Sequence, residues 1–239
     1  MFPDIGARGR VSMWKGMMKI LQIMIMAVLL AGAGPLTAGT QSQSPQIQAM
    51  ETALKAKPND PKLLFDLGIL VFDQAANGDT EAVERAAGIF EQLIKQDAKN
   101  AEYHSRYGSI LTMRGRDAWF PLEKMRQVNN GLEEMDKAVA FAPDNVAVRL
   151  IRANTCYALP GIFNRINTAV DDCQYLCRLF EKNPGAYSES LWMKTRLLLA
   201  SSLQRSGRKE ESRSVLEKII AEASGSRYAE EAKKMLAKS

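Results

Sequence analysis

The stretch from Ala101 to Pro143 constrains the fold most, because small and bulky residues recur in it at helical spacing. This pattern predicts two antiparallel helices that end in a capped turn. A small residue at Gly108 lets the second helix approach the first closely, and bulky neighbours fill the space between successive pairs. Pro143 stops the second helix, because proline has no amide hydrogen to continue it.

The spacing in this stretch resembles a tetratricopeptide repeat. The two halves of the repeat pattern are matched by His104, Tyr107, Gly108 and Leu111, and by Gly131, Met135, Ala138 and Pro143. The resemblance implies helix pairs stacked into a curved array, with protein binding on its concave surface.

Three further helix pairs follow the same pattern, with their small residues at Gly68, Ala153 and Ala200. All are further apart than the roughly 34 residues of an ordinary repeat. We expect the surplus at residues 116–126 and 158–167. In the third pair Arg149 and Arg152 stand where the family has bulky apolar residues, and we expect them to reach a carboxylate or solvent while their stems pack.

Two further helices complete the array. A helix from residue 47 to 57 supplies the second half of an incomplete repeat, and an amphipathic helix after Ser226 covers the open end. We therefore expect an all-α fold, a tetratricopeptide-like helical-hairpin solenoid with lengthened repeats. It spans residues 47–239 and includes the C-terminal capping helix.

Residues 1–38 predict a signal peptide, because two lysines precede the apolar run Ile20–Leu30 and small residues follow it. Cleavage is expected after Ala33 or Ala38. The run is short of the roughly 20 apolar residues of a membrane helix, so cleavage is favoured over anchoring. Residues 39–46 are polar and predict a linker.

The leader predicts an exported, periplasmic protein, or an inner-membrane-anchored one if the leader is retained. The formal net charge is +5, but most of the excess lies in the leader and charges of both signs alternate elsewhere. No nucleic-acid binding is expected, and contact with a membrane is expected only through an uncleaved leader.

A groove is expected along the first helix of each pair, counted from its small residue. Its lining would be apolar in the first repeat and rich in hydroxyl and amide groups later, which suits an extended peptide or a helix. The predicted groove residues are Phe65, Ile69, Phe72, Ser105, Ser109, Thr112, Asn154, Tyr157, Ser201 and Gln204. For the three apolar residues the alternative is that they contact the leading helix instead.

Two insertions carry apolar residues at Trp119, Phe120, Ile162 and Phe163. Both insertions join a first helix to a second helix, so they should emerge at the same edge of the array. One interpretation is an exposed patch that binds a partner. The favoured one is a satellite core, because two neighbouring inserts can bury each other.

Catalysis, metal binding and cofactors find little support, because the chain has no hydrolase, phosphate-loop or zinc-protease motif. No catalytic residue, metal ligand or cofactor is expected. The single histidine, His104, occupies a packing position. The adjacent carboxylates are expected on solvated faces: Asp171 and Asp172, Glu133 and Glu134, and Glu210 and Glu211.

The three cysteines are Cys156, Cys173 and Cys177. Packing as small apolar residues is favoured over a disulfide from Cys156 to one of the other two. A thiolate metal site is favoured least, because the histidine is distant in sequence.

These observations favour a protein–protein interaction scaffold or accessory protein of a cell-envelope complex, with a peptide or helix of another protein in the groove. The alternative is a binding component for a small molecule or lipid, with a pocket between Asn154, Tyr157 and the apolar inserts.

Overall fold

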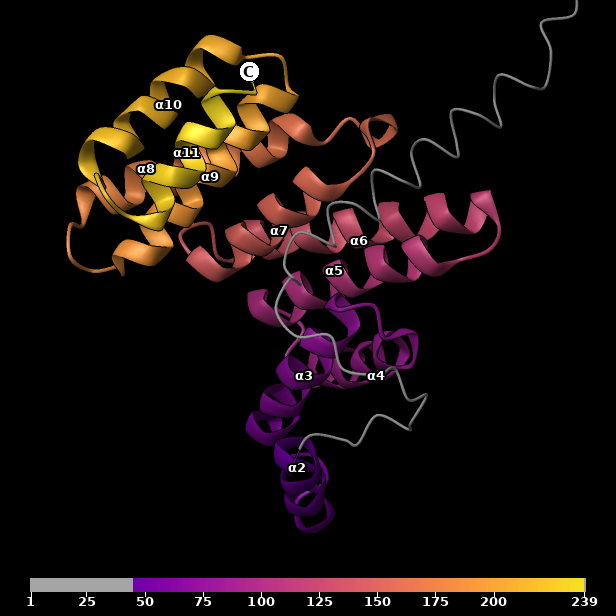
Figure 1. The fold of residues 1–239 in the computed structure, drawn as a ribbon. Coiled ribbons are helices and arrows are strands. Elements are labelled where there is room, and N and C mark those ends of the chain that lie inside the picture. The colour runs from indigo at the N-terminus through magenta and orange to yellow at the C-terminus, as the bar shows by residue number, and fades with distance from the viewer. Residues whose placement is uncertain (1–44, 239) are drawn as a thin grey trace, which may run out of the picture. The chain divides into compact units, whose positions relative to one another are not determined.

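The computed structural model describes residues 45–238 and contains, within them, ten α-helices, one 3₁₀ turn and no strand (Figure 1). The all-α prediction is therefore confirmed. The elements are α2 (Pro45–Ala56), α3 (Pro61–Ala76), α4 (Thr80–Gln96), α5 (Ala101–Asp117), α6 (Pro121–Phe141), α7 (Val146–Ala158), η2 (Gly161–Phe163), α8 (Ile166–Lys182), α9 (Glu189–Arg205), α10 (Lys209–Glu222) and α11 (Arg227–Leu236). Within this range no helix is long and apolar enough to cross a membrane. The predicted signal peptide and most of the predicted linker lie outside the described residues.

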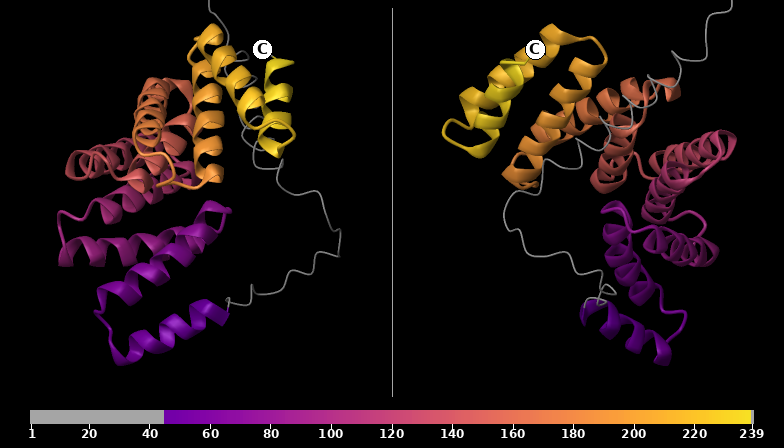
Figure 2. Two further views of the ribbon diagram at one scale, coloured as in Figure 1. Left: turned by 90° about the vertical axis from the view of Figure 1, so that its left-hand side faces the viewer. Right: turned by 45° about the vertical axis from the view of Figure 1, so that its right-hand side comes forward.

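The helices form four antiparallel hairpins, α3–α4, α5–α6, α7–α8 and α9–α10, stacked in chain order (Figure 2). Consecutive first helices contact one another, as α3 with α5, α5 with α7, and α7 with α9. Among the described residues no comparable contact joins consecutive second helices. The first helices therefore lie on the inner, concave side of the array, as expected for a solenoid of helix pairs.

Side-chain caps set where most helices begin. Asp60 accepts hydrogen bonds from the amides of Lys62 and Leu63, and Pro61 occupies the first turn of α3, where no amide hydrogen is needed. Asn100 caps α5 and Asn145 caps α7 in the same way. The start of each first helix is thus fixed locally, before any contact between repeats.

The predicted small residues all lie in the core. Gly68 and Gly108 are buried in α3 and α5, and Ala153 and Ala200 are fully buried in α7 and α9. Beside them the largest buried side chains include Phe90, a leucine-rich set and Met135, which fill the space between hairpins. The repeat spacing therefore located the close approaches correctly.

Both ends of the array are covered. Ile47 of α2 is buried in the first core cluster, and Ala229 and Ala232 of α11 are buried against the last hairpin. On the outer face of α11, Lys233 pairs with Glu230 at 2.8 Å. The last helix therefore has an apolar inner face and a charged outer face.

Candidate functional site

The first section of the concave side combines aromatic rings with a cation. The Cζ atom of Arg106, on α5, lies 5.6 Å from the ring centroid of Phe65 and 5.5 Å from that of Phe72, both on α3. These two phenylalanines are half-buried and pack against the core cluster that includes Ile47 of α2. Both rings are therefore partly accessible on α3 while they pack against the core of the first repeat.

The Arg106 guanidinium is short of partners. Its Nε atom is buried without a hydrogen bond, and among the described residues the side chain forms no ion pair within 4 Å. Burial lowers the pKa of Arg106, although the nearby carboxylates of Glu102 and Asp73 act in the opposite direction. A half-buried cation with unused donors is a favourable place for a carboxylate, because hydrogen bonds to charged groups are the stronger ones.

A depression of about 490 Å³ continues from Phe65 toward the connections α4–α5 and α6–α7. Its wall is formed by aromatic rings and by polar groups of the helix caps. The lining includes Phe65, Tyr103, Phe141, Glu102, Asn100 and Asn145. Because its exposed lining is mostly polar, it can hydrogen-bond to the backbone or to a polar side chain of a bound segment.

The middle section of the predicted groove is closed, which corrects the sequence prediction. Ser105, Ser109 and Thr112 are only 0, 5 and 9% exposed. The hydroxyl of Ser109 lies 3.4 Å from that of Thr155, so α5 and α7 meet through small side chains. Ser109 is buried where α5 meets α7, whereas Thr112 lies against Gly131 of α6, so neighbouring helices cover the predicted groove positions from two sides.

The last section is polar and more open. Asn154 is exposed and donates to the Leu150 carbonyl at 2.7 Å, and Ser201 donates to the Leu197 carbonyl at 2.9 Å. Tyr157 is half-buried beneath Arg205, and Gln204 is half-buried. Asn154 and Ser201 therefore donate hydrogen bonds to carbonyls of their own helices.

Arg205 fills the space beside Tyr157. Its guanidinium lies 5.6 Å from the Tyr157 ring centroid and donates to the carbonyls of Tyr157 and Leu159. These carbonyls belong to the C-terminal end of α7, where no amide of the helix is available to them. The contact ties α9 to α7.

The edge patch is exposed rather than buried. Trp119, Phe120 and Ile162 are 87, 69 and 76% exposed, and Leu122 and Met125 in the first turns of α6 join them at 81 and 46%. Phe163 differs, because it packs against the cluster that holds Val128 and Leu132. The favoured satellite core is therefore wrong for most of the patch and right for Phe163.

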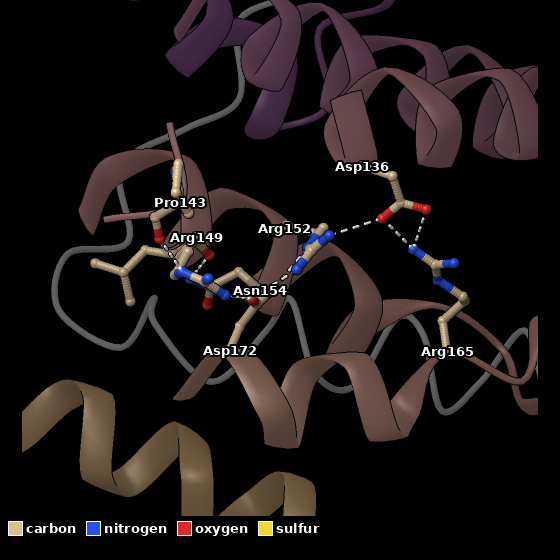
Figure 3. Close-up of polar contacts among 8 residues, drawn as sticks. Asp136, Pro143, Arg149, Arg152, Asn154, Arg165 and Asp172 are labelled. Carbon is tan, nitrogen blue, oxygen red and sulfur yellow. Dashed lines mark hydrogen bonds and ion pairs between the residues drawn. The ribbon is translucent and has the colours of Figure 1, made fainter. Parts of the chain in front are cut away.

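A buried ionic cluster lies between α6, α7 and α8 (Figure 3). Asp172 is fully buried and accepts from Arg149 Nη1 at 2.6 Å and from Arg152 Nε and Nη2 at 2.7 and 2.8 Å. Asp136 bridges Arg152 and Arg165. The expectation that the two arginines reach a carboxylate is confirmed, whereas the solvated-face prediction is wrong for Asp172.

His104 has a packing role, as predicted. Its Nδ1 atom lies 2.5 Å from Glu134 Oε2, and its Nε2 atom lies 3.0 Å from the Ala98 carbonyl oxygen. Burial raises the pKa of Glu134, but hydrogen bonds from Lys137 and His104 outweigh burial and hold that pKa below its ordinary value. The solvated-face prediction is therefore wrong for Glu134 too.

The three cysteines are free and buried, in agreement with the packing interpretation. Burial raises the pKa of Cys177 to about 12 and raises that of Cys173 further. Within residues 45–238 no three histidine, cysteine or carboxylate side chains are grouped as a metal site would require.

Among solved structures, the crystal structure of TTC0263, a thermophilic TPR protein of Thermus thermophilus, is similar to this chain with a TM-score of 0.58. The sequences are 18% identical over 77% of this chain and 87% of that one. The chain has a tetratricopeptide-like fold. Two crystal structures of MamA also match this tetratricopeptide-like chain, both with a TM-score of 0.47 and 16% identity, over 73 and 81% of this chain and 79 and 90% of theirs. No family model and no curated protein matches the sequence.

Three features of the tetratricopeptide-like array were missed from the sequence. The first is Arg106, which directly follows the predicted groove residue Ser105. The available signal was the pair of phenylalanines, Phe65 and Phe72, on the first helix of the preceding repeat. Leu122 and Met125 extend the edge patch, and their apolar character next to Trp119 and Phe120 could have indicated this. The buried state of Asp172 had no local signal.

Proposed function

We propose that this chain is a protein-interaction scaffold, acting as an accessory protein of a cell-envelope complex. The tetratricopeptide-like fold supports this, because a curved row of helix pairs offers an extended binding surface. The location rests on the signal-peptide pattern in residues 1–38, which favours the periplasm, or the inner membrane if the leader is retained.

The observation that carries the proposal is the Arg106 guanidinium between the rings of Phe65 and Phe72. The rings shield one side of the cation from water, which strengthens its interaction with an anion. Arg106 itself forms no ion pair with another described residue, so the accessible part of its guanidinium can donate to an incoming carboxylate.

The shape of this section favours a peptide or helix of another protein. Phe65, Ile69 and Phe72 follow one another at intervals of four and three residues, so they form one stripe along α3. A partner helix with apolar side chains at matching spacing and one acidic residue would cover the stripe and reach Arg106. The depression beside Phe65, whose exposed lining is mostly polar, would hydrogen-bond to the backbone of that partner.

Position-specific cross-linking in a cell-envelope extract tests this proposal. The full chain carries a photo-crosslinking residue in place of half-exposed Ile69, and adducts with a partner are identified. Arg106→Met keeps the aliphatic stem between the rings but removes the charge, and should greatly reduce the adduct. The matched control is Arg213→Met on the exposed face of α10, which should leave the adduct unchanged.

Equal adducts in the two variants would show that Arg106 does not bind the partner, and the absence of any adduct at position 69 would remove the groove from the proposal. The small-molecule alternative has less support, since Arg205 occupies the space beside Tyr157 where its pocket was expected.

A further inference from the structure

The largest apolar side chains that the described residues expose are concentrated at one end of the α5–α6 hairpin. We call them the apolar tip, defined as Trp119, Phe120, Leu122, Met125 and Ile162. The first four lie in the α5–α6 connection and the first turns of α6, and Ile162 lies in η2 of the next hairpin. Figure 1 shows these two connections on the same side of the array.

We propose that the apolar tip inserts into the interfacial region of a lipid bilayer. Its side chains project from a hairpin end instead of lining a hollow, and Trp119 is 87% exposed. A protein partner would need a deep matching pocket to cover them, whereas lipid deforms around a protruding group. A bilayer therefore requires no complementary shape.

The composition of the tip suits the boundary between headgroups and acyl chains. Tryptophan is enriched there, because its ring is apolar and its indole N–H still reaches water or headgroups. Phe120 and Leu122 supply the apolar area that gives binding free energy. Ile162 adds a further exposed apolar side chain from η2 of the next hairpin.

The charges next to the tip are arranged so that insertion leaves no uncompensated carboxylate. Asp117 pairs with Arg116 at 2.7 Å, and Glu123 pairs with Arg126 at 2.6 Å. Lys124 donates to the Arg116 carbonyl and is half-buried. These five residues together carry a net charge of about +1. A charge this small permits binding to zwitterionic lipid and modestly favours anionic lipid.

The chain also has a means of reaching a bilayer. Its first residues contain the apolar run Ile20–Leu30 behind two lysines, a pattern that directs a chain to a membrane whether or not it is later cleaved. A predicted leader of this kind brings the chain to a bilayer, which favours a bilayer over a second copy of this chain as the occupant.

Fluorescence of Trp119 tests the proposal in the full chain. Trp14→Phe and Trp192→Phe leave it as the single tryptophan of the three. The probe is a phosphatidylcholine vesicle with brominated acyl chains, with and without phosphatidylglycerol. We expect a blue shift and quenching of Trp119, with little change at high salt because the tip is nearly neutral.

Two substitutions separate the tip from the rest of the chain. Leu122→Ser should raise the lipid concentration for half-quenching roughly tenfold, the factor that corresponds to burial of about one leucine side chain. The comparison is Phe141→Ser, which removes another exposed apolar ring at the opposite end of α6 and should leave the lipid concentration for half-quenching unchanged.

Three results would overturn the proposal. The first is unquenched Trp119 with brominated vesicles. The second is quenching that Leu122→Ser leaves unchanged, which would show that the leader alone holds the chain at the bilayer. The third is self-association in sedimentation that Leu122→Ser abolishes without any vesicle quenching, which would make the tip a protein interface. A dye attached through Ile162→Cys repeats the measurement with the native tryptophans and Leu122 in place, because the native cysteines are buried.

Discussion

Gly108 of α5 and Gly131 of α6 face each other where the two helix backbones approach closely. A Cβ atom on Gly108 would lie 2.5 Å from the Gly131 carbonyl oxygen and 3.0 Å from the Met135 amide nitrogen. Both obstacles are backbone atoms, so a local side-chain rotation cannot relieve the clash. The close packing of α5 against α6 therefore requires glycine at both positions, because neither can carry a side chain.

Gly108→Ala should lower the free energy of unfolding by about 1–3 kcal/mol or more, because the extra methyl forces two helix backbones apart. Gly88→Ala is the matched control. Gly88 is also inside a helix, but a Cβ atom there has no neighbour within 4 Å, so alanine should stabilise by up to about 1 kcal/mol. Urea unfolding of the two variants measures both effects, and a loss at Gly88 as large as at Gly108 would contradict the steric explanation.

Asp172→Asn should destabilise the protein by about 3–5 kcal/mol, because it leaves the buried Arg149 and Arg152 without their shared carboxylate. Its exposed neighbour provides the comparison. Asp171→Asn changes the same chemical group on the solvent side and should alter stability by less than about 0.5 kcal/mol. Thermal unfolding followed by circular dichroism distinguishes the two, and similar shifts in Tm would show that the cluster contributes no special stability.

The stability of the protein should depend on pH through Glu134. Its pKa in the folded state is lowered, so its contribution is complete above the unfolded pKa of about 4.3 and is lost as pH falls through the folded-state value. Glu134→Gln should therefore be less stable than wild type near neutral pH, and the difference should shrink at acidic pH. Denaturant unfolding across pH measures this, with Glu133→Gln as the exposed control, and a constant difference down to low pH would refute the assignment.

The native thiols should not react with a maleimide at neutral pH. All three are buried, and burial holds the pKa of Cys177 at about 12 and that of Cys173 higher, so thiolate is scarce. Mass spectrometry should find no label in the folded protein and three labels in denaturant. Ile162→Cys introduces an exposed thiol as a positive control, and rapid labelling of the unaltered folded chain would contradict the burial.

The helix pairs and their small residues could be predicted from sequence, because each depends on local periodicity and on one geometric requirement. Gly108 shows this, since a fixed spacing from Leu111 identified both its helix and its close contact. The same argument located the capping helix after Ser226, whose hydroxyl accepts from the Ala229 amide. Local signals of this kind do not require knowledge of which helices meet.

The depth of each side chain could not be predicted, because it depends on the distance between helices far apart in sequence. Ser109 lies on the inner face as expected, but Thr155 of α7 covers it. Arg149 and Arg152 predicted contact with a carboxylate or with solvent. Nothing in the sequence distinguished Asp172, which binds both arginines, from its exposed neighbour Asp171. For the same reason the sequence left open whether Trp119 is exposed or buried in a satellite core, since no sequence rule says whether two inserts meet.

Every substantial contact in the described array joins helices no more than two apart along the chain. Because the first and last hairpins of the described array do not contact each other, each should unfold locally without the other. The central α5–α6 hairpin, packed through its glycines, should stay folded longest. Hydrogen exchange should then rank the amides by distance from α5 and α6. A pulling force applied at the two ends should remove the hairpins in succession.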